Sequence, residues 1–371
     1  MKKIFFTIDW LTILPVLAIS IIGFIILINF NINDIYPVNQ SLIIKHAISI
    51  VLGLFAAIIV SQIDYRVFST IIQPLFFGIS ILLILVLIFG DRINGAKSWF
   101  YVGPFNMQPG EFAKIGVVLI IAHYFTRYHH KINSFMSIIL SLIPVIVIVL
   151  LILLQPDFGT AVILLLIWLG MLVFSGIKLQ HIIVLMVLGI ISFSFLWVGI
   201  FQDYQKERIL TFLNPTSDPL GSGYNVLQSM RSVSSGGVTG VNELIVAVPE
   251  IHTDFIFSGL AQKWGFVGVS IYFTLVLLIV GRMIYLGLRS QDTFPRMIIL
   301  GVTLALLIQF FINIGMNIGF LPITGVPLPF MSYGGSSMLV YWTLIGLVLS
   351  IQNHKLAQGT IFMKDTQDIF G

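Results

Sequence analysis

Residues 10–29 read WLTILPVLAISIIGFIILIN, a stretch without a charged side chain. A helix needs about 20 mostly apolar residues to cross the hydrocarbon core of a bilayer, so this stretch predicts a membrane span. The run is too long for the apolar region of a signal peptide and lacks a small-residue cleavage site, so we expect an uncleaved first span. Similar apolar runs lie near 42–61, 69–90, 110–126, 135–154, 157–176, 180–201, 257–281, 296–320 and 337–353.

The composition agrees with a chain that lies mostly in lipid. Of its 371 residues, 58% are hydrophobic and 9% are Asp, Glu, Lys or Arg, whereas a soluble domain carries about 25% charged residues. Uninterrupted apolar runs also differ from the alternating pattern of a transmembrane β-barrel, so strands are not expected. The sequence therefore predicts a single all-α integral membrane domain over residues 1–371, with about ten transmembrane helices.

The distribution of basic residues predicts the orientation of these helices. If the N-terminus is cytoplasmic, the short connections on that side carry most of the Lys and Arg residues, and the opposite short connections near 30–41, 155–156 and 321–336 carry none. Lys and Arg concentrate in cytoplasmic loops, so we expect both termini in the cytoplasm. The connection near 202–256, between the seventh and eighth spans, is then one large extracytoplasmic loop. The basic residues on the cytoplasmic side are Lys2, Lys3, Arg66, Arg127, Lys131, Lys178, Arg282, Arg289, Arg296, Lys355 and Lys364.

Several classes of function are excluded by what the sequence lacks. Its basic residues are scattered, without the Lys/Arg run of a nucleic-acid-binding face. Cysteine is absent, which removes disulfides and thiolate chemistry. No GxxxxGK[ST] phosphate loop, HExxH zinc motif or GxSxG nucleophile elbow occurs. We therefore expect no nucleic-acid partner and no use of ATP or a redox cofactor.

Two motifs place acids at the expected outer ends of spans, where a charge is costly unless it has a function or a partner. Gln108–Lys114 reads QPGEFAK and puts Glu111 and Lys114 three residues apart on one helix face, where they can pair. This pair is either purely structural or part of a site. Gln155–Thr160 reads QPDFGT and begins an apolar helix with Asp157, which either caps that helix or contributes to the same outer surface.

A third acidic motif ends the long loop. Pro249–Phe257 reads PEIHTDFIF and places Asp254 at the boundary between water and lipid. Loss of hydration there raises the pKa of a carboxyl toward that of a general base. A plain capping acid is an equal alternative from spacing alone. His252 and Asp254 supply at most two ligands, fewer than a zinc site needs.

Two further features predict a polar cavity on the same side. Gln309, Asn313 and Asn317 recur every four residues in the ninth span and form a hydrophilic stripe. The alternative for such amides is a set of hydrogen bonds between helices. The irregular segment 322–337 follows, and irregular backbone at membrane depth is tolerated only against protein or water. We expect both features to line one outer cavity.

Taken together, these motifs resemble those of the SEDS family, the polytopic glycosyltransferases that polymerise peptidoglycan. The resemblance extends over nearly the whole chain, and further segments of the long loop and its surroundings contribute to it. These segments are Asn94–Trp99, Asp203–Arg208, Asp218–Tyr224, Gln228–Ser229, Ser235–Gly237 and Ser332–Ser336. The short N-terminus and Asp203–Arg208 are more similar to the RodA branch of the family than to the FtsW branch.

The resemblance implies a multi-pass protein of the bacterial cytoplasmic membrane whose substrate is lipid II, a disaccharide-pentapeptide on undecaprenyl pyrophosphate. Polymerisation at the outer face would serve cell elongation. The implied partners are the nascent glycan strand, a class B penicillin-binding protein transpeptidase and other membrane proteins of the elongation complex. Asp254 would correspond to the essential acid of the family and act as general base, Glu111 and Lys114 would be the fourth-span ion pair, and Asp157 would be another functional loop acid.

A leaving pyrophosphate develops negative charge, which cations stabilise. Four basic residues lie on the expected outer side, and with Asp157 and Asn317 they are the candidates for substrate binding. These four are Lys97, Lys206, Arg208 and Arg231. A divalent cation, Mg²⁺ or Mn²⁺, is an alternative source of positive charge, although the sequence holds no dedicated ligand cluster.

The chain departs from the family pattern in its loop region. Gln262 and Lys263 stand where an acidic pair is usual, Met230 and Arg231 stand where a Lys and an apolar residue are usual, and the segment 240–249 is short. These departures keep two alternatives to the enzyme open. One is a flippase for a lipid-linked sugar, and the other is a non-catalytic scaffold of the elongation complex.

Overall fold

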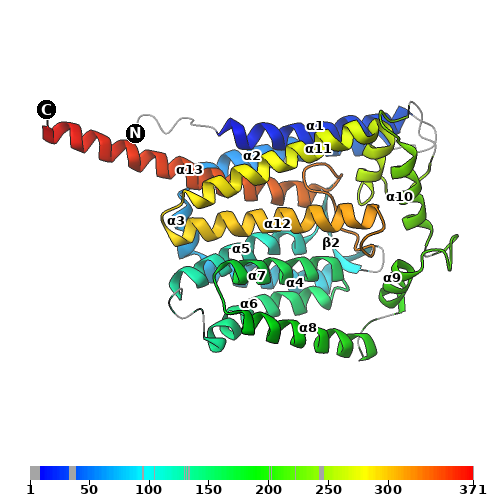
Figure 1. Cartoon of the computed structure of the whole chain (residues 1–371), viewed down its shortest axis with the longest axis horizontal. Coiled ribbons are helices and arrows are strands. Elements are labelled where there is room, and N and C mark those ends of the chain that lie inside the picture. Colours follow the sequence, from blue (N-terminus) through cyan, green and yellow to red (C-terminus); the bar gives the residue numbers. More distant parts are fainter. Residues whose placement is uncertain are drawn as a thin grey trace.

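The structure, a computed structural model, describes residues 9–32, 39–93, 96–103, 105–128, 130, 132, 134–199, 201, 203–221, 223–241 and 246–370. It is mainly helical (Figure 1). The first helices are α1 (Trp10–Ile32), α2 (Gln40–Gln62), α3 (Tyr65–Thr70), α4 (Ile72–Phe89), α5 (Pro109–Arg127), α6 (Phe135–Leu153) and α7 (Phe158–Phe174). They are followed by α8 (Leu179–Gly199), α9 (Asp203–Leu213), α10 (Tyr224–Ser235), α11 (Ile256–Leu288), α12 (Thr293–Asn317) and α13 (Gly335–Phe370).

Every predicted apolar run coincides with a long helix. In the part of the chain that the structure describes, 8 helices are long and apolar enough to cross a membrane: α1, α2, α4, α6, α8, α11, α12 and α13. The runs near 110–126 and 157–176 form α5 and α7. These two helices are not among the 8, because Glu111 and Lys114 lower the mean hydropathy of α5 and because α7 has only 17 residues. The helical membrane fold is confirmed, and the count of ten spans stays a prediction.

The helices pack around α12 and α5 in the middle of the bundle (Figure 1). Helix α12 contacts α5, α7, α11 and α13, and α13 lies along α2. The core between them is apolar, with Val117, Ile121, Val302 and Leu306 fully buried. Helix α8 lies at the edge, where its apolar stretch has no buried residue and suits contact with lipid.

Local sequence explains where several helices begin or bend. Asn39, Asp64 and Asp157 cap α2, α3 and α7, because each side chain accepts a hydrogen bond from a backbone N–H of the first turn. Helix α11 is interrupted at Gly265, whose φ of 59° and ψ of −156° are open to glycine but not to a residue with a Cβ. A Cβ there would also lie 2.4 Å from the backbone nitrogen of Gly240. The kink therefore lets the loop approach α11 closely.

Two parts of the chain hold structure that the sequence did not predict. The connection between α4 and α5 is an antiparallel sheet of β1 (Asp91–Ile93), β2 (Ala96–Val102) and β3 (Phe105–Met107), in that order. Aromatic residues Trp99, Phe100 and Tyr101 favour a strand there, so the all-α expectation is wrong for this segment. The region 202–256, expected as a loop, contains helices α9 and α10.

The long connection lies at the opposite end of the bundle from the start of α1 and the end of α13. Figure 1 shows α9 and α10 at one end, and the beginning of α1 and the end of α13 at the other. This arrangement agrees with the prediction that both termini lie on the side opposite the long loop. Some residues used for that prediction, or for the resemblance, lie outside the described residues: Lys2, Lys3, Asn94, Gly95, Lys131, 242–245 and the side chains of Lys355 and Lys364.

Candidate active site

Asp254 lies in a tight turn immediately before α11. The backbone N–H groups of Thr253, Asp254 and Phe255 all donate to the carbonyl oxygen of Glu250, at 3.1–3.2 Å. Glu250 itself has a φ of 53°, in the left-handed region. Phe255 occupies the N-cap position of α11, and the cap has no side-chain hydrogen bond. The Asp254 carboxylate therefore does not cap α11, and the capping alternative is wrong.

The amide stripe of α12 holds the backbone of Asp254 in place. Asn313 and Asn317 donate through Nδ2 to the Asp254 carbonyl oxygen, at 2.8 and 3.0 Å. Asn317 Oδ1 also accepts the backbone N–H of Ser258 at 3.1 Å. Both asparagines are fully buried. Asn317, expected as a substrate contact, therefore has its amide engaged by protein atoms and positions Asp254.

The irregular segment 322–337 fixes the same turn from another side. Ser332 Oγ donates to the Thr253 carbonyl oxygen at 2.5 Å, and the Tyr333 N–H donates to the His252 carbonyl oxygen at 2.9 Å. Gly325, with a φ of 70°, lies against the carboxylate, because a Cβ there would be 3.6 Å from Asp254 Oδ2. Hydrogen bonds from α12 and from segment 322–337, which are far apart in the sequence from residue 254, thus hold the turn that contains Asp254.

The surroundings of Asp254 give its carboxyl the pKa of a general base. Burial, and after it the negative charge of Glu250, raise this pKa from 3.8 to about 7, while the positive charge of Arg208 lowers it. A group that titrates near 7 can accept a proton at neutral pH and release it again. Arg208 belongs to α9, so this helix brings one predicted cation into the electrostatic surroundings of Asp254.

The other predicted basic residues are spread over the same end of the protein. Lys206 is partly buried on α9, and Arg231 is exposed on α10. Lys97, on β2, donates through Nζ to the carbonyl oxygen of Ile88 at 2.9 Å. A small pocket beside Arg208 connects α9 with the start of α7 and with residues 322–324. The structure therefore brings Arg208 to Asp254 and leaves the others as surrounding positive charge.

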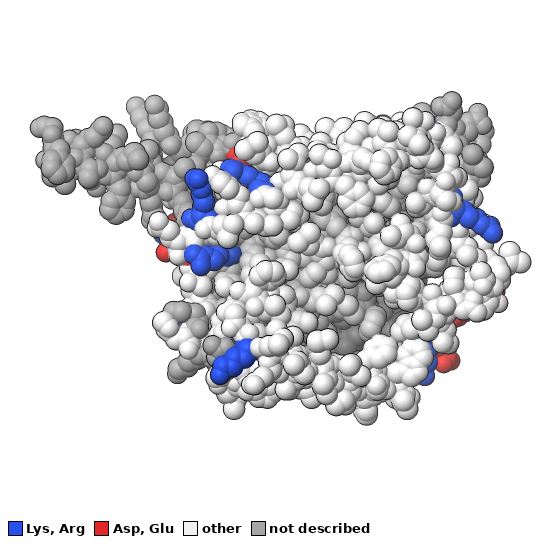
Figure 2. Space-filling model, in the orientation of Figure 1, with Lys and Arg blue, Asp and Glu red and all other residues white. Residues whose placement is uncertain are grey.

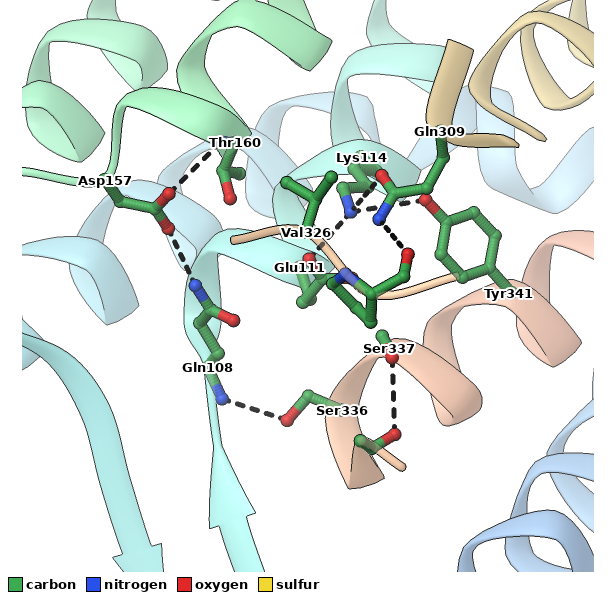
Figure 3. A network of polar contacts seen from close by, with 12 residues as sticks. Gln108, Glu111, Lys114, Asp157, Thr160, Gln309, Val326, Ser336, Ser337 and Tyr341 are labelled. Atoms are coloured by element: carbon green, nitrogen blue, oxygen red, sulfur yellow. Dashed lines mark hydrogen bonds and ion pairs between the residues drawn. The ribbon is translucent and has the colours of Figure 1, made fainter. Parts of the chain in front are cut away.

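Glu111 and Lys114 form the predicted ion pair, and they do so inside the bundle. Lys114 Nζ lies 2.7 Å from Glu111 Oε1, and it also donates to Gln309 Oε1 at 3.1 Å and to the Tyr341 hydroxyl at 3.3 Å (Figure 3). Gln309 Nε2 donates in turn to the Pro327 carbonyl oxygen at 2.8 Å. The stripe of α12 therefore contacts the ion pair at Gln309 and Asp254 at Asn313 and Asn317.

Asp157 connects three helices as well as capping one. Its Oδ1 accepts the Thr160 N–H at 3.1 Å, and its Oδ2 accepts Gln108 Nε2 at 2.7 Å (Figure 3). The Gln108 N–H donates to Ser336 Oγ at 2.9 Å. The starts of α7, α5 and α13 are thereby joined beside the ion pair.

Tyr341 is a member of this network that the sequence analysis missed. The available signal was a lone tyrosine in an apolar span, because a buried tyrosine hydroxyl usually has a hydrogen-bond partner. Two of the unusual loop-region residues have packing roles. Gln262 is buried and accepts Ser232 Oγ at 3.3 Å, and Met230 Sδ lies 2.6 Å from where a Gly319 Cβ would stand. Among the described residues, no three His, Cys, Asp or Glu side chains are placed to hold a metal ion.

Comparison with known proteins identifies the family. Residues 9–357 match the family model for FtsW, RodA and SpoVE, which is described as "Cell cycle protein". The chain belongs to this family, the SEDS family. The peptidoglycan glycosyltransferase MrdB of Escherichia coli K12 is 38% identical over 315 residues, which cover 82% of this chain and 84% of MrdB.

Further SEDS relatives agree with the expected RodA branch. The peptidoglycan glycosyltransferase RodA of Treponema pallidum is 31% identical over 428 residues, covering 94% of this chain and 98% of RodA. A solved chain from a peptidoglycan synthase complex that coordinates polymerisation and crosslinking superposes with a TM-score of 0.79. It is 31% identical, and the match covers 92% of this chain and 97% of that one. The predicted family is confirmed, and the similarity to MrdB and RodA favours the predicted RodA branch.

Proposed function

We propose that this protein is a peptidoglycan glycosyltransferase of the RodA type that polymerises lipid II during cell elongation. The relatives MrdB and RodA are named as peptidoglycan glycosyltransferases. The single observation that carries the proposal for this chain is the Asp254 carboxyl. Its pKa is about 7, and it immediately precedes α11, whose first turn is hydrogen-bonded to α10 through Ser232 and Ser258.

In the proposed reaction, Asp254 acts as the general base. It takes the proton from the acceptor sugar hydroxyl while that oxygen attacks the anomeric carbon of the donor, and the bond to the undecaprenyl pyrophosphate breaks. Negative charge develops on the leaving pyrophosphate, and positive groups in a poorly hydrated site stabilise it. Arg208 and Lys206 of α9 are the proposed contacts, with Lys97 and Arg231 as outer ones. No step is assigned to Mg²⁺ or Mn²⁺.

The remaining predicted site residues have supporting roles in this proposal. Asn317 holds the Asp254 backbone, and Asp157 keeps the start of α7 joined to α5 beside the substrate. The Glu111–Lys114 pair fixes α5 against α12. These roles follow from the hydrogen bonds at 2.7–3.1 Å described above.

The proposed arrangement in the membrane has ten spans. Helices α5 and α7 join the 8 apolar helices as buried spans, and the segment with α9 and α10 lies outside. Both termini are then in the cytoplasm of the bacterial cell, as the bias in Lys and Arg supports. The polyprenyl tail of the substrate would lie in the bilayer, against apolar helix surfaces such as that of α8.

We also propose a transpeptidase partner. The solved relative belongs to a complex that coordinates polymerisation with crosslinking. A class B penicillin-binding protein would supply the crosslinking activity next to this chain, which supplies the glycan strand. Other membrane proteins of the elongation complex are expected to join them.

The test is polymerisation of labelled lipid II by the purified full-length protein. Asp254→Ala and Asp254→Asn should lower the rate by at least about 100-fold, because general base catalysis contributes about that much or more. Glu207→Gln, at an exposed position on α9, removes one carboxylate at the same end and should retain the wild-type rate. Unchanged thermal unfolding would show that the variants are folded.

The same variants separate the enzyme from its two alternatives. If Asp254→Asn polymerises lipid II at the wild-type rate, Asp254 is not the base. If the wild-type protein makes no glycan and Asp254→Asn still restores cell shape, the chain is a scaffold. Transport of a labelled lipid-linked sugar in vesicles that is lost in Lys114→Met would instead favour the flippase.

A further inference from the structure

A second polar site lies at the opposite end of the bundle from Asp254. A cavity of about 330 Å³ opens between the end of α11, the first part of α12 and α13. Its lining contains both polar and apolar side chains, and Arg282, Tyr285 and Arg289 form its polar wall. The residues that matter for its chemistry are Arg282, Tyr285, Leu286, Arg289, Val348 and Gln352.

Two arginines flank one tyrosine on the polar wall. The guanidinium carbon of Arg289 lies 4.7 Å from the ring centre of Tyr285, and that of Arg282 lies 5.2 Å from it. Arg282 also binds both carboxylate oxygens of Asp9, at 2.8 and 3.1 Å. The start of α1 is thereby attached to this wall.

The wall carries more positive than negative charge. Arg296 of α12 donates to the carbonyl oxygen of Ser290, a lining residue, at 2.6 and 3.1 Å. In these connected segments, Arg282, Arg289 and Arg296 outnumber the described acids, which are Asp9 and the exposed Asp292. Figure 2 shows basic side chains gathered on this end of an otherwise largely uncharged face.

The rest of the lining, from α13 and from Leu286 of α11, supplies apolar contacts and one unsatisfied acceptor. Val348 is fully buried, and Leu286 is partly buried. Within the described part of the chain, the buried Oε1 of Gln352 has no hydrogen-bond partner. A buried acceptor without a donor is costly. Since Gln352 lines the cavity, a hydroxyl bound there would satisfy Oε1 once the amide turns toward it. Beside the cavity, Ile284 and Leu288 of α11 are 51% and 80% exposed and offer an apolar surface to acyl chains.

We propose that this cavity binds the headgroup of an anionic, glycerol-containing phospholipid, that is, phosphatidylglycerol or cardiolipin. The phosphate lies against Arg289 and Arg282, and a glycerol hydroxyl donates to Gln352 Oε1. The acyl chains follow the exposed side of α11. Basic pockets between membrane helices on the cytoplasmic side suit such headgroups, and this is the end that we assign to the cytoplasm. The bound lipid bridges α11 and α13, so it stabilises the fold.

The experiment measures the thermal unfolding of the full-length protein in detergent during titration with phosphatidylglycerol, and with phosphatidylcholine as the uncharged comparison. Phosphatidylglycerol should raise the unfolding temperature saturably, and phosphatidylcholine should not. Arg289→Gln should weaken the apparent affinity for phosphatidylglycerol about fivefold, the effect of one basic residue near a membrane surface. Leu286→Trp fills the cavity without changing charge and should weaken it at least as much.

Lys178→Gln is the matched control, because it removes one positive charge from an exposed site between α7 and α8. It should leave the affinity unchanged. An equal loss in Lys178→Gln and Arg289→Gln would mean general attraction to a charged surface and would overturn the proposal. Equal stabilisation by phosphatidylcholine would do the same. Inorganic phosphate is the last arm, since displacement of the lipid by millimolar phosphate would identify a site for the free anion instead.

Discussion

Asp254 derives its raised pKa from burial and from the charge of Glu250, while Arg208 lowers it. A general base works only when it is deprotonated, so polymerisation should rise with pH and reach half its maximum near pH 7. Arg208→Gln removes the opposing cation, and the rising limb should move to higher pH. Glu250→Gln removes the neighbouring anion, and the limb should move to lower pH. The measurement is the polymerisation rate against pH.

Opposite shifts of the pH profiles of Arg208→Gln and Glu250→Gln are the result that identifies the base. A general loss of structure would lower the rate of either variant without shifting the two profiles in opposite directions. Glu207→Gln, on the exposed side of α9, serves as the control and should leave the profile in place. Shifts of Arg208→Gln and Glu250→Gln in the same direction would contradict the assignment of Asp254 as the titrating base.

The sequence identified Asp254, Glu111 and Asp157 because acids next to proline or at the start of an apolar run are conspicuous in a chain with 9% charged residues. The hydrogen-bond partners of these acids were harder to predict from the sequence. Ser332 reaches the Asp254 turn across 79 residues of sequence, and Tyr341 reaches Lys114 across 227. Such contacts depend on how the helices are packed, which the spacing of motifs along the chain does not specify.

At the scale of elements, the buried ion pair of α5 should stabilise its contact with α12. Lys114→Met leaves Glu111 as a buried charge without its cation, which costs about 3–5 kcal/mol in the free energy of unfolding. The double variant Glu111→Gln/Lys114→Met has no buried charge and should recover much of this loss. Denaturant unfolding in detergent measures both values.

Lys178→Met is the control for this cycle, since Lys178 is exposed and its substitution should change stability little. Equal destabilisation by the single and double variants would mean that the cost comes from lost packing rather than from an unpaired charge. The polymerisation rate of the double variant then reports whether the pair has a role beyond stability.

Helices were predictable where hydrophobicity decided them. The apolar run predicted near 135–154 corresponds to helix α6 at Phe135–Leu153, and the run predicted near 10–29 corresponds to α1 at Trp10–Ile32. Helices α9 and α10 were missed because they are short, and their sequences mix charged and polar residues. The sheet between α4 and α5 was missed because its strands are short and depend on pairing with each other rather than on a strong alternating pattern.

At the scale of the whole molecule, α9 and α10 lie at one end of the bundle and the connection between α11 and α12 at the other (Figure 1). The natural chain has no cysteine, so a single introduced thiol reports the side on which it lies. Ser217→Cys, between α9 and α10, should react with a membrane-impermeant maleimide on intact cells. Gln291→Cys, between α11 and α12, should react only after lysis. Both positions are exposed, so accessibility within the protein is matched. The reverse pattern would place Asp254 on the cytoplasmic side, where glycan strands are not assembled, and the proposed reaction would fail with it.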